Sequence, residues 1–168
     1  MIDQHQRVAV IAGGIRNLAT SIAQQLTREG FDLAIIDQDR KSMLHIATKI
    51  GRESGRNILT IMADITVEGQ LSAALSRAVQ QFGKLDLIIV YADMESNQVS
   101  FPLCEKYANS VMEEQGSGVI IQIEPQSGRI VRYCNSGDPG QERIDFPTDQ
   151  VLTDTVACEM IIKLVDIQ

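Results

Sequence analysis

Apolar runs of five or six residues alternate with longer amphipathic segments over the first 90 residues, and this alternation limits the possible folds more than any other feature. The runs lie at residues 7–12, 31–36, 58–62 and 85–90. Near-continuous apolar runs are typical of strands in a parallel sheet that is covered on both faces. Strands that alternate with helices predict a doubly wound α/β fold of three α/β/α layers.

The segments between these runs have the periodicity and the end residues of helices. Leu18, Ile22 and Leu26 recur at the spacing of one helix face in the first segment. Glycine is common just beyond a helix end, so Gly30, Gly51 and Gly83 are expected to end the three helices in turn. Thr66 is a candidate cap for the start of the third helix.

After residue 90 the pattern becomes less regular. Residues 94–101 have the composition of a loop, and Pro102 suits the first turn of a helix that continues to Gly116. Residues 119–123 are expected to form a fifth strand of the sheet.

Residues 124–150 are rich in proline and glycine and are expected to be mostly loop. Within them, residues 129–134 either pair back on the fifth strand as a hairpin or belong to an irregular loop. A final helix with a wide apolar stripe is expected over residues 149–164.

Length and charge narrow the class of protein further. A chain of 168 residues predicts a single domain, residues 1–168. The net charge of −7 makes nucleic acid or an anionic membrane surface an improbable partner. No apolar run approaches the roughly 20 residues of a membrane span, and the start of the chain lacks a basic-then-apolar leader pattern. We therefore expect a cytoplasmic protein without a nucleic-acid or membrane partner.

The three cysteines, Cys104, Cys134 and Cys158, are far apart in the sequence and include no CxxC pair. His5 and His45 are also distant from them, so no metal site is predicted. Reduced thiols in a reducing compartment are the expected state.

The turn after the first apolar run is the best candidate for a ligand site. Free N–H groups and the dipole at a helix N-terminus attract phosphate, and glycines allow a pyrophosphate to approach the backbone. Asn17 stands where a later glycine is usual in such turns. The motif predicts either a plain tight turn or a dinucleotide site whose contacts would include Gly13, Gly14, Arg16, Asn17 and Leu18.

Two carboxylates follow the second and third runs. Asp37 stands where a carboxylate accepts hydrogen bonds from a ribose hydroxyl and repels a 2′-phosphate, which favours NAD over NADP, although Arg40 and Lys41 follow closely. The alternative for Asp37 is an acid at a helix N-terminus. Asp64 is expected at the sheet edge where ligands of such folds bind, or else as a loop or capping acid.

Together these residues resemble the short-chain dehydrogenase/reductase family. The segments that carry the resemblance are VAVIAGG, LDLIIVYA, FPLCEKYANSVMEEQGSGVIIQI, the turn Ala63-Asp64-Ile65-Thr66, and the spacing of Ser127-Gly128 and Asn135-Ser136-Gly137. The resemblance implies a Rossmann-like fold, an NAD(P) cofactor and hydride transfer between an alcohol and a carbonyl. It also adds Ile65 and Ala92 to the expected cofactor contacts.

The family's catalytic residues are replaced at the matching positions. The resemblance places a Ser just after the fifth strand, a Tyr thirteen residues later and a Lys four after that; these positions hold Pro125, Asp138 and Glu142. Proline has no hydroxyl, and a carboxylate is a poor proton donor near neutral pH. Glu142 has the opposite charge to the lysine that lowers the tyrosine pKa. No catalytic residue is assigned by this matching.

Other positions also depart from the family. Val90-Tyr91-Ala92-Asp93 matches the family's Asn-Asn-Ala-Gly, and Asp93 adds a negative charge beside the cofactor path. The stretch from Asp93 to Phe101 is shorter than in the family, and we expect a fold that is shortened at its C-terminus, where the resemblance places the last strand and the substrate lid.

One tyrosine is a weak substitute for the missing proton donor. Tyr133 lies in the loop that contains the family's tyrosine position, and Arg129 or Arg132 would be near it. Its alternative is an aromatic residue of an edge strand. Cys134 is better explained as a packed thiol than as a nucleophile, since no histidine is nearby in the sequence to activate it.

Three functions remain open from the sequence. The first is a catalytically inactive family member that binds NAD or acts through a partner protein. The second is an active NAD-dependent oxidoreductase on a polyol phosphate, with displaced catalytic groups. The third is a structural module that binds no dinucleotide. A homodimer through the helix at residues 149–164 is also expected.

Overall fold

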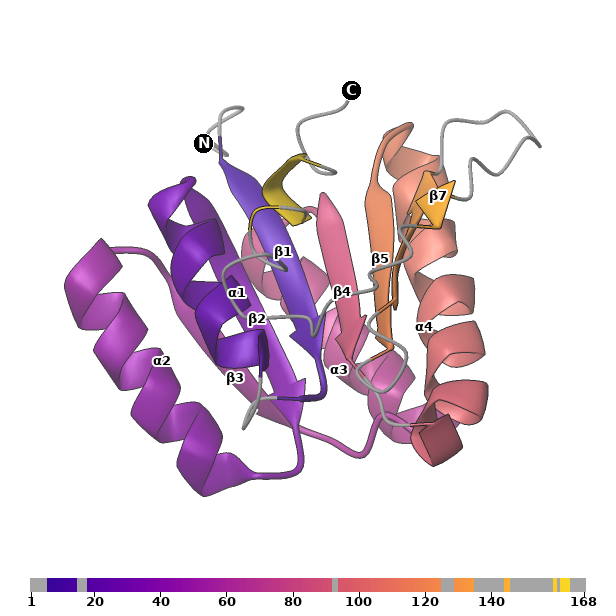
Figure 1. Cartoon of the computed structure of the whole chain (residues 1–168), viewed down its shortest axis with the longest axis horizontal. Coiled ribbons are helices and arrows are strands. Elements are labelled where there is room, and N and C mark those ends of the chain that lie inside the picture. The colour runs from indigo at the N-terminus through magenta and orange to yellow at the C-terminus, as the bar shows by residue number, and fades with distance from the viewer. Residues whose placement is uncertain are drawn as a thin grey trace.

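Figure 1 shows a computed structural model of the chain, which describes residues 6–14, 18–91, 94–124, 129–134, 144–145, 159 and 161–163. The described strands form one sheet in the order β3-β2-β1-β4-β5-β6-β7. They are β1 (Arg7–Ala12), β2 (Phe31–Asp37), β3 (Ile58–Met62), β4 (Leu87–Tyr91), β5 (Val119–Glu124), β6 (Arg129–Cys134) and β7 (Ile144–Asp145). The helices labelled in Figure 1 are α1 (Leu18–Arg28), α2 (Arg40–Ser54), α3 (Glu68–Phe82) and α4 (Met94–Gln115).

The first five strands are parallel, as predicted. Strand β1 lies at the centre, with Ala12 opposite Ile36 of β2 on one side and opposite Val90 of β4 on the other. The chain therefore winds outward from β1 in both directions, which makes the β1–β4 boundary a topological switch point. Ligands of doubly wound folds bind at the carboxyl edge of the sheet at such a point.

Helices cover both faces of the parallel sheet. On one face, Ala9 and Ile11 pack with Ile22 and Leu26 of α1. On the other face, the alternate β1 residues Val8 and Val10 pack in one core with α3 and α4. Side chains of a strand point alternately to its two faces, so one apolar run supplies both cores. The predicted Rossmann-like fold of three α/β/α layers is confirmed.

Residues 129–134 form the hairpin that was one of the two sequence alternatives. Strand β6 runs antiparallel to β5, with Arg129 opposite Glu124 and Cys134 opposite Val119. The two-residue strand β7 pairs antiparallel with β6. An antiparallel extension therefore continues the sheet beyond its five parallel strands.

The expected loop at residues 94–101 is wrong, because α4 begins at Met94 and includes Pro102 in its interior. The helix is maintained by packing: Phe101, Cys104, Ala108 and Met112 recur at helical spacing and are all buried in the α3–α4 core. Proline removes one intrahelical hydrogen bond, and this tertiary burial offsets the loss.

Two further helix ends differ from the sequence expectation. Helix α2 continues through Gly51 and ends at Ser54, where Gly55 has φ 66° and donates its N–H to the Gly51 carbonyl. Buried Ile50 holds the last turns of this helix on the sheet. Helix α3 has Val67, not Thr66, at its N-cap, because the Thr66 side chain turns back to Asp64. Gly83 ends α3 as predicted.

Only part of the expected final helix lies within the described residues. Residues 159 and 161–163 are helical, and Ile161 is buried in the core beside α1. The rest of residues 149–164, with the predicted dimer surface, lies outside the described residues.

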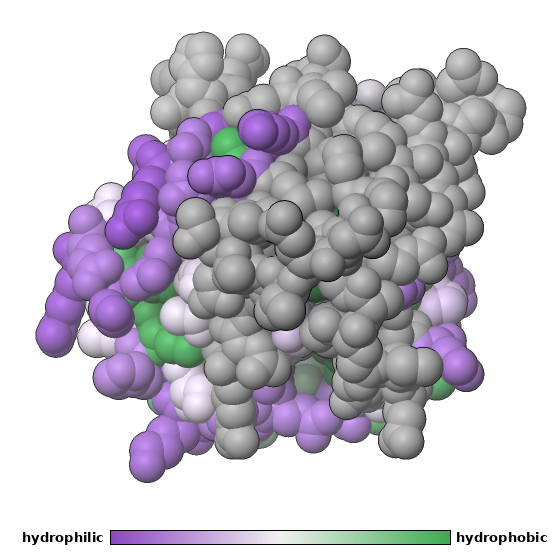
Figure 2. Space-filling model, viewed as in Figure 1, coloured by the Kyte–Doolittle hydropathy of each residue, from purple (hydrophilic) through white to green (hydrophobic). Residues whose placement is uncertain are grey.

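The outer surface over α2 is mainly hydrophilic in the view of Figure 2. Leu44 of α2 and Met62 of β3 are isolated exposed apolar side chains. Among the helices that the structure describes, none is long and apolar enough to cross a membrane.

Truncation of a central core residue should destabilise the fold strongly. Ile11 is fully buried, so we expect Ile11→Ala to lower the free energy of unfolding by about 2–5 kcal/mol through lost burial and cavity formation. Urea denaturation measures this change. The control is Met62→Ala, whose side chain is 66% exposed and should change stability by about 0.5 kcal/mol at most. Equal losses in the two variants would contradict the assignment of the core.

Candidate functional site

The turn after β1 is built on two glycines with left-handed backbone angles. Gly13 has φ 81° and Gly14 has φ 72°, a region that residues with a Cβ adopt only at a cost. The Gly13 N–H donates to the carbonyl of Ile36 on β2 at 2.8 Å. The turn is thereby fixed at the carboxyl edge of the sheet, from which the chain continues to the start of α1.

Close packing against β4 also requires the two glycines. A Cβ on Gly13 would overlap the carbonyl oxygen of Tyr91 and come within 3.1 Å of Ile65 Cδ1. A Cβ on Gly14 would overlap the Tyr91 side chain. Contacts within the protein thus explain why both positions hold glycine. This geometry is the one expected for a plain tight turn and also for a dinucleotide site.

The structure describes only some of the residues predicted to contact the cofactor. Leu18 is the first residue of α1, whose positive dipole end therefore lies at the same edge as Gly14. Arg16, Asn17 and Ala92 lie outside the described residues, as does Asp93.

Asp37 ends β2 beside the glycine turn. Its Oδ1 accepts a hydrogen bond from the Asp39 N–H at 2.9 Å. The N-cap of α2 is Asp39, which accepts from the Ser42 N–H at 3.1 Å and from the Ser42 hydroxyl at 2.7 Å. The helix-capping role considered for Asp37 thus belongs to Asp39, and Asp37 remains a partly exposed carboxylate at the sheet edge.

Asp64 orders the loop before α3. Its Oδ1 accepts from the Thr66 hydroxyl at 2.6 Å and from the Thr66 N–H at 2.9 Å. These two hydrogen bonds, the hydroxyl first, lower the pKa of Asp64 below its usual value. This geometry agrees with the alternative in which Asp64 is an acid that orders its own loop. The next residue, Ile65, is buried and extends toward Gly13.

The described site residues are brought to one edge by the strand order. Gly13 and Gly14 contact Tyr91, and Ile65 lies beside Gly13. A hydrogen bond from the Ala63 N–H to the Asp37 carbonyl, 3.1 Å long, joins the loops that follow β2 and β3. Tyr91 is absent from the predicted contacts. The signal that could have indicated it is its position at the end of the fourth apolar run, which the sheet order places beside β1.

Of the residues at or near the family's catalytic positions, the structure describes Tyr133 but not the three matched positions. Pro125, Asp138 and Glu142 lie outside the described residues. Tyr133 of β6 pairs with Ile120, the second residue of β5, whereas Glu124 at the carboxyl end of β5 pairs with Arg129. Tyr133 is therefore placed toward the amino edge of the parallel strands.

Cys104 is a buried thiol in the α3–α4 core. Desolvation by burial raises its pKa to about 12, which makes it unreactive as a nucleophile at neutral pH. Within the described part of the chain, no three His, Cys, Asp or Glu side chains are grouped to hold a metal ion.

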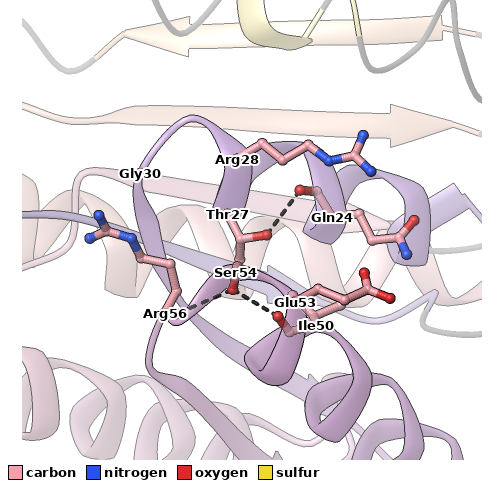
Figure 3. A pocket seen from close by; sticks show the side chains of 8 residues that line it. All are labelled: Gln24, Thr27, Arg28, Gly30, Ile50, Glu53, Ser54 and Arg56. Carbon is pink, nitrogen blue, oxygen red and sulfur yellow. Dashed lines mark hydrogen bonds between the residues drawn. The ribbon is translucent and has the colours of Figure 1, made fainter.

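A hollow of about 470 Å³ lies at the opposite end of α1 and α2 (Figure 3). The Thr27 hydroxyl donates to the Gln24 carbonyl at 2.9 Å, and the Ser54 hydroxyl donates to the Ile50 carbonyl at 2.7 Å. In Figure 3 the side chains of Arg28 and Arg56 extend in different directions. The hollow is at the amino edge of the sheet, so we do not assign it to the nucleotide site.

Removing the Thr66 hydroxyl should raise the pKa of Asp64. We expect this in Thr66→Ala because the hydroxyl is the largest cause of the lowered pKa, and a titration of the Asp64 carboxyl by NMR measures it. A carboxylate whose pKa is lower in the folded than in the unfolded state stabilises the fold at pH values above the unfolded-state pKa. This stabilisation is lost as the pH falls through the folded-state pKa. The difference in the free energy of unfolding between the wild type and Thr66→Ala should therefore become smaller in acid. Thr66→Ser retains a hydroxyl and is the control; an unchanged pKa in Thr66→Ala would contradict the assignment.

Known proteins share this fold and part of this sequence. The chain is 30% identical over 152 residues to sorbitol-6-phosphate 2-dehydrogenase of Escherichia coli (strain K12), covering 78% of this chain and 58% of that protein. A solved hydroxysteroid dehydrogenase from Escherichia coli aligns with a TM-score of 0.65 and 25% identity, covering 70% of this chain and 54% of that one.

A 3-ketoacyl-(acyl-carrier-protein) reductase from Brucella melitensis, solved in complex with NADH, has the same fold at 23% identity. Its TM-score is 0.62, and the alignment covers 70% of this chain and 56% of that one. The chain spans a little over half the length of the curated relatives that it matches.

The family model for short chain dehydrogenases matches residues 7–113, which include the glycine turn, Asp37, Asp64 and Tyr91. This match confirms the resemblance seen in the sequence: the chain belongs to the short chain dehydrogenase family.

Proposed function

We propose that the chain binds NAD at the β1–β4 switch point and does not itself transfer hydride. The observation that carries the proposal is the position of the Gly13-Gly14 turn. It lies at the carboxyl edge of the central strand and the start of α1, with the Asp37 carboxylate at the end of the neighbouring strand. This combination supplies groups for both a pyrophosphate and a ribose.

The described residues are chemically suited to such a ligand. The N–H groups at the start of α1 would face the pyrophosphate, and glycine at position 14 leaves that position of the turn without a side chain. The carboxylate of Asp37 would accept a hydrogen bond from a ribose hydroxyl and repel the 2′-phosphate of NADP. In catalytic members of the family NAD supplies the hydride, whereas in this chain these residues would only bind and orient the cofactor.

The absence of hydride transfer is supported by the side chains that stand in place of a proton donor. The family positions hold Pro125, Asp138 and Glu142. Tyr107 donates its hydroxyl to Glu68 at 2.8 Å on the α3–α4 side of the sheet, and Tyr133 is placed toward the amino edge. We therefore infer a role in binding or regulation, with a second copy or another protein as partner.

A second candidate function is an active oxidoreductase on a polyol phosphate. The observation in its favour is the 30% identity to sorbitol-6-phosphate 2-dehydrogenase. It requires catalytic groups that are displaced or come from another subunit, and Tyr133 is its candidate in this chain. A third candidate, a module without a dinucleotide, is favoured by the packing that already explains both glycines.

Titration with NADH should separate these functions. We expect NADH to bind the wild-type protein and Asp37→Ala to weaken binding about tenfold, because a charge-assisted hydrogen bond contributes about 1.5 kcal/mol or more. NADH emission is suited to this measurement because the chain has no tryptophan. Glu53→Ala, which removes one exposed carboxylate at the far end of α2, should bind NADH as the wild type does. If the wild-type protein did not bind NADH, the structural module without a dinucleotide would be the remaining function.

Turnover is a separate measurement. We expect no NADH oxidation above a blank with ketose phosphates, and no NAD reduction with polyol phosphates, because the family's Ser, Tyr and Lys are replaced. Turnover by the wild type would contradict the inactive assignment. Loss of that turnover in Tyr133→Phe would then identify the displaced proton donor.

A further inference from the structure

We infer that Tyr91 is the positioning residue of the nucleotide site: its ring holds the Gly13-Gly14 turn in the conformation that receives the pyrophosphate. The inference rests on the proposed NAD site. It adds a determinant of affinity that neither the glycine motif nor the carboxylates contain.

Tyr91 occupies the end of the strand that adjoins the glycine turn. Val90, the residue before it, pairs with Ala12, the last residue of β1. On the other side of β4, Tyr91 itself pairs with Ile123 of β5. Tyr91 is therefore the first residue of β4 beyond the pairing with β1, and its backbone is held by β5.

The side chain of Tyr91 points to the face of the sheet that α1 covers, where it packs on the core that contains Ile11 and Ile22. Its ring thus lies on the sheet side of the turn that leads to α1. A ligand at the start of α1 approaches from beyond the carboxyl edge, so the ring can support the turn from beneath without taking the place of the ligand.

Both glycines are shaped by this one residue. The three heavy atoms nearest to a Cβ on Gly14 are Cδ1, Cγ and Cβ of Tyr91, the last of them 2.8 Å away. At Gly13 the nearest atom is the Tyr91 carbonyl oxygen. Contact is made by the base of the ring and by the backbone, which cannot move aside as the flexible end of a long side chain can.

The contact matters for binding because glycine is conformationally permissive. Two successive glycines at φ 81° and 72° have many alternative conformations, and a ligand that needs one of them must offset the cost of selecting it. A ring packed on Gly14 removes part of that freedom in advance. Preorganisation of this kind increases affinity without any contact between Tyr91 and the ligand.

NADH affinity in three variants tests the inference. Tyr91→Phe retains the ring and should bind NADH within twofold of the wild type. Tyr91→Ala should bind at least tenfold more weakly while retaining the far-ultraviolet circular dichroism of the wild type. Tyr107→Ala removes another partly buried tyrosine ring, on the α4 side. It should lower the melting temperature and leave the affinity for NADH unchanged.

A second measurement tests the contact even if Tyr91→Ala loses stability. Gly14→Ala should lower the melting temperature more in the wild-type background than in the Tyr91→Ala background, because the overlap with the ring exists only in the first. Additive changes in melting temperature would overturn the inference. Equal NADH affinity of the wild type and Tyr91→Ala would overturn it while the proposed NAD site stands. No NADH binding by the wild type would overturn both.

Discussion

The close approach of the glycine turn to the end of β4 is the constraint on which the carboxyl edge depends. Strand β1 lies beside β4, and the chain that leaves it passes close to Tyr91 at the end of β4. Gly13 and Gly14 allow this because neither has a Cβ, and the space is taken by Tyr91 and Ile65. The positions of the neighbouring loops follow, since Gly13 bonds to β2 and the Asp37 carbonyl bonds to the loop after β3.

Much of this fold could be predicted from sequence because local and tertiary preferences agree in the first half of the chain. Each of the strands β1 to β3 is a near-continuous apolar run, and helices α1 and α3 have regular apolar faces that end near a glycine. Where local preference and burial disagree, burial decides. Residues 94–101 lack apolar periodicity, and Pro102 disfavours a helix interior, yet the buried face that begins at Phe101 retains the helix.

The candidate site was predictable in part, for the same reason. Gly13, Gly14 and Asp37 stand at the ends of consecutive strands, so their positions follow from the alternation itself. The importance of Tyr91 depends on which strand is the neighbour of β1, and that is a property of the sheet order. The roles of Asp37 and Asp39 depend on which carboxylate caps α2, and a hydrogen bond to Ser42 decides this in favour of Asp39.

In the proposed function, nucleotide binding and hydride transfer would depend on different parts of the chain. The family match covers residues 7–113, where the glycine turn and the carboxylates lie, whereas the positions of the family's Ser, Tyr and Lys all come after β5. The pairing of β1 with β2, which positions the turn and Asp37, joins residues 7–12 to residues 31–36. In this proposal the proton-transfer groups can therefore be replaced while the groups that would bind a nucleotide are retained. This separation is why we propose binding without chemistry for this chain.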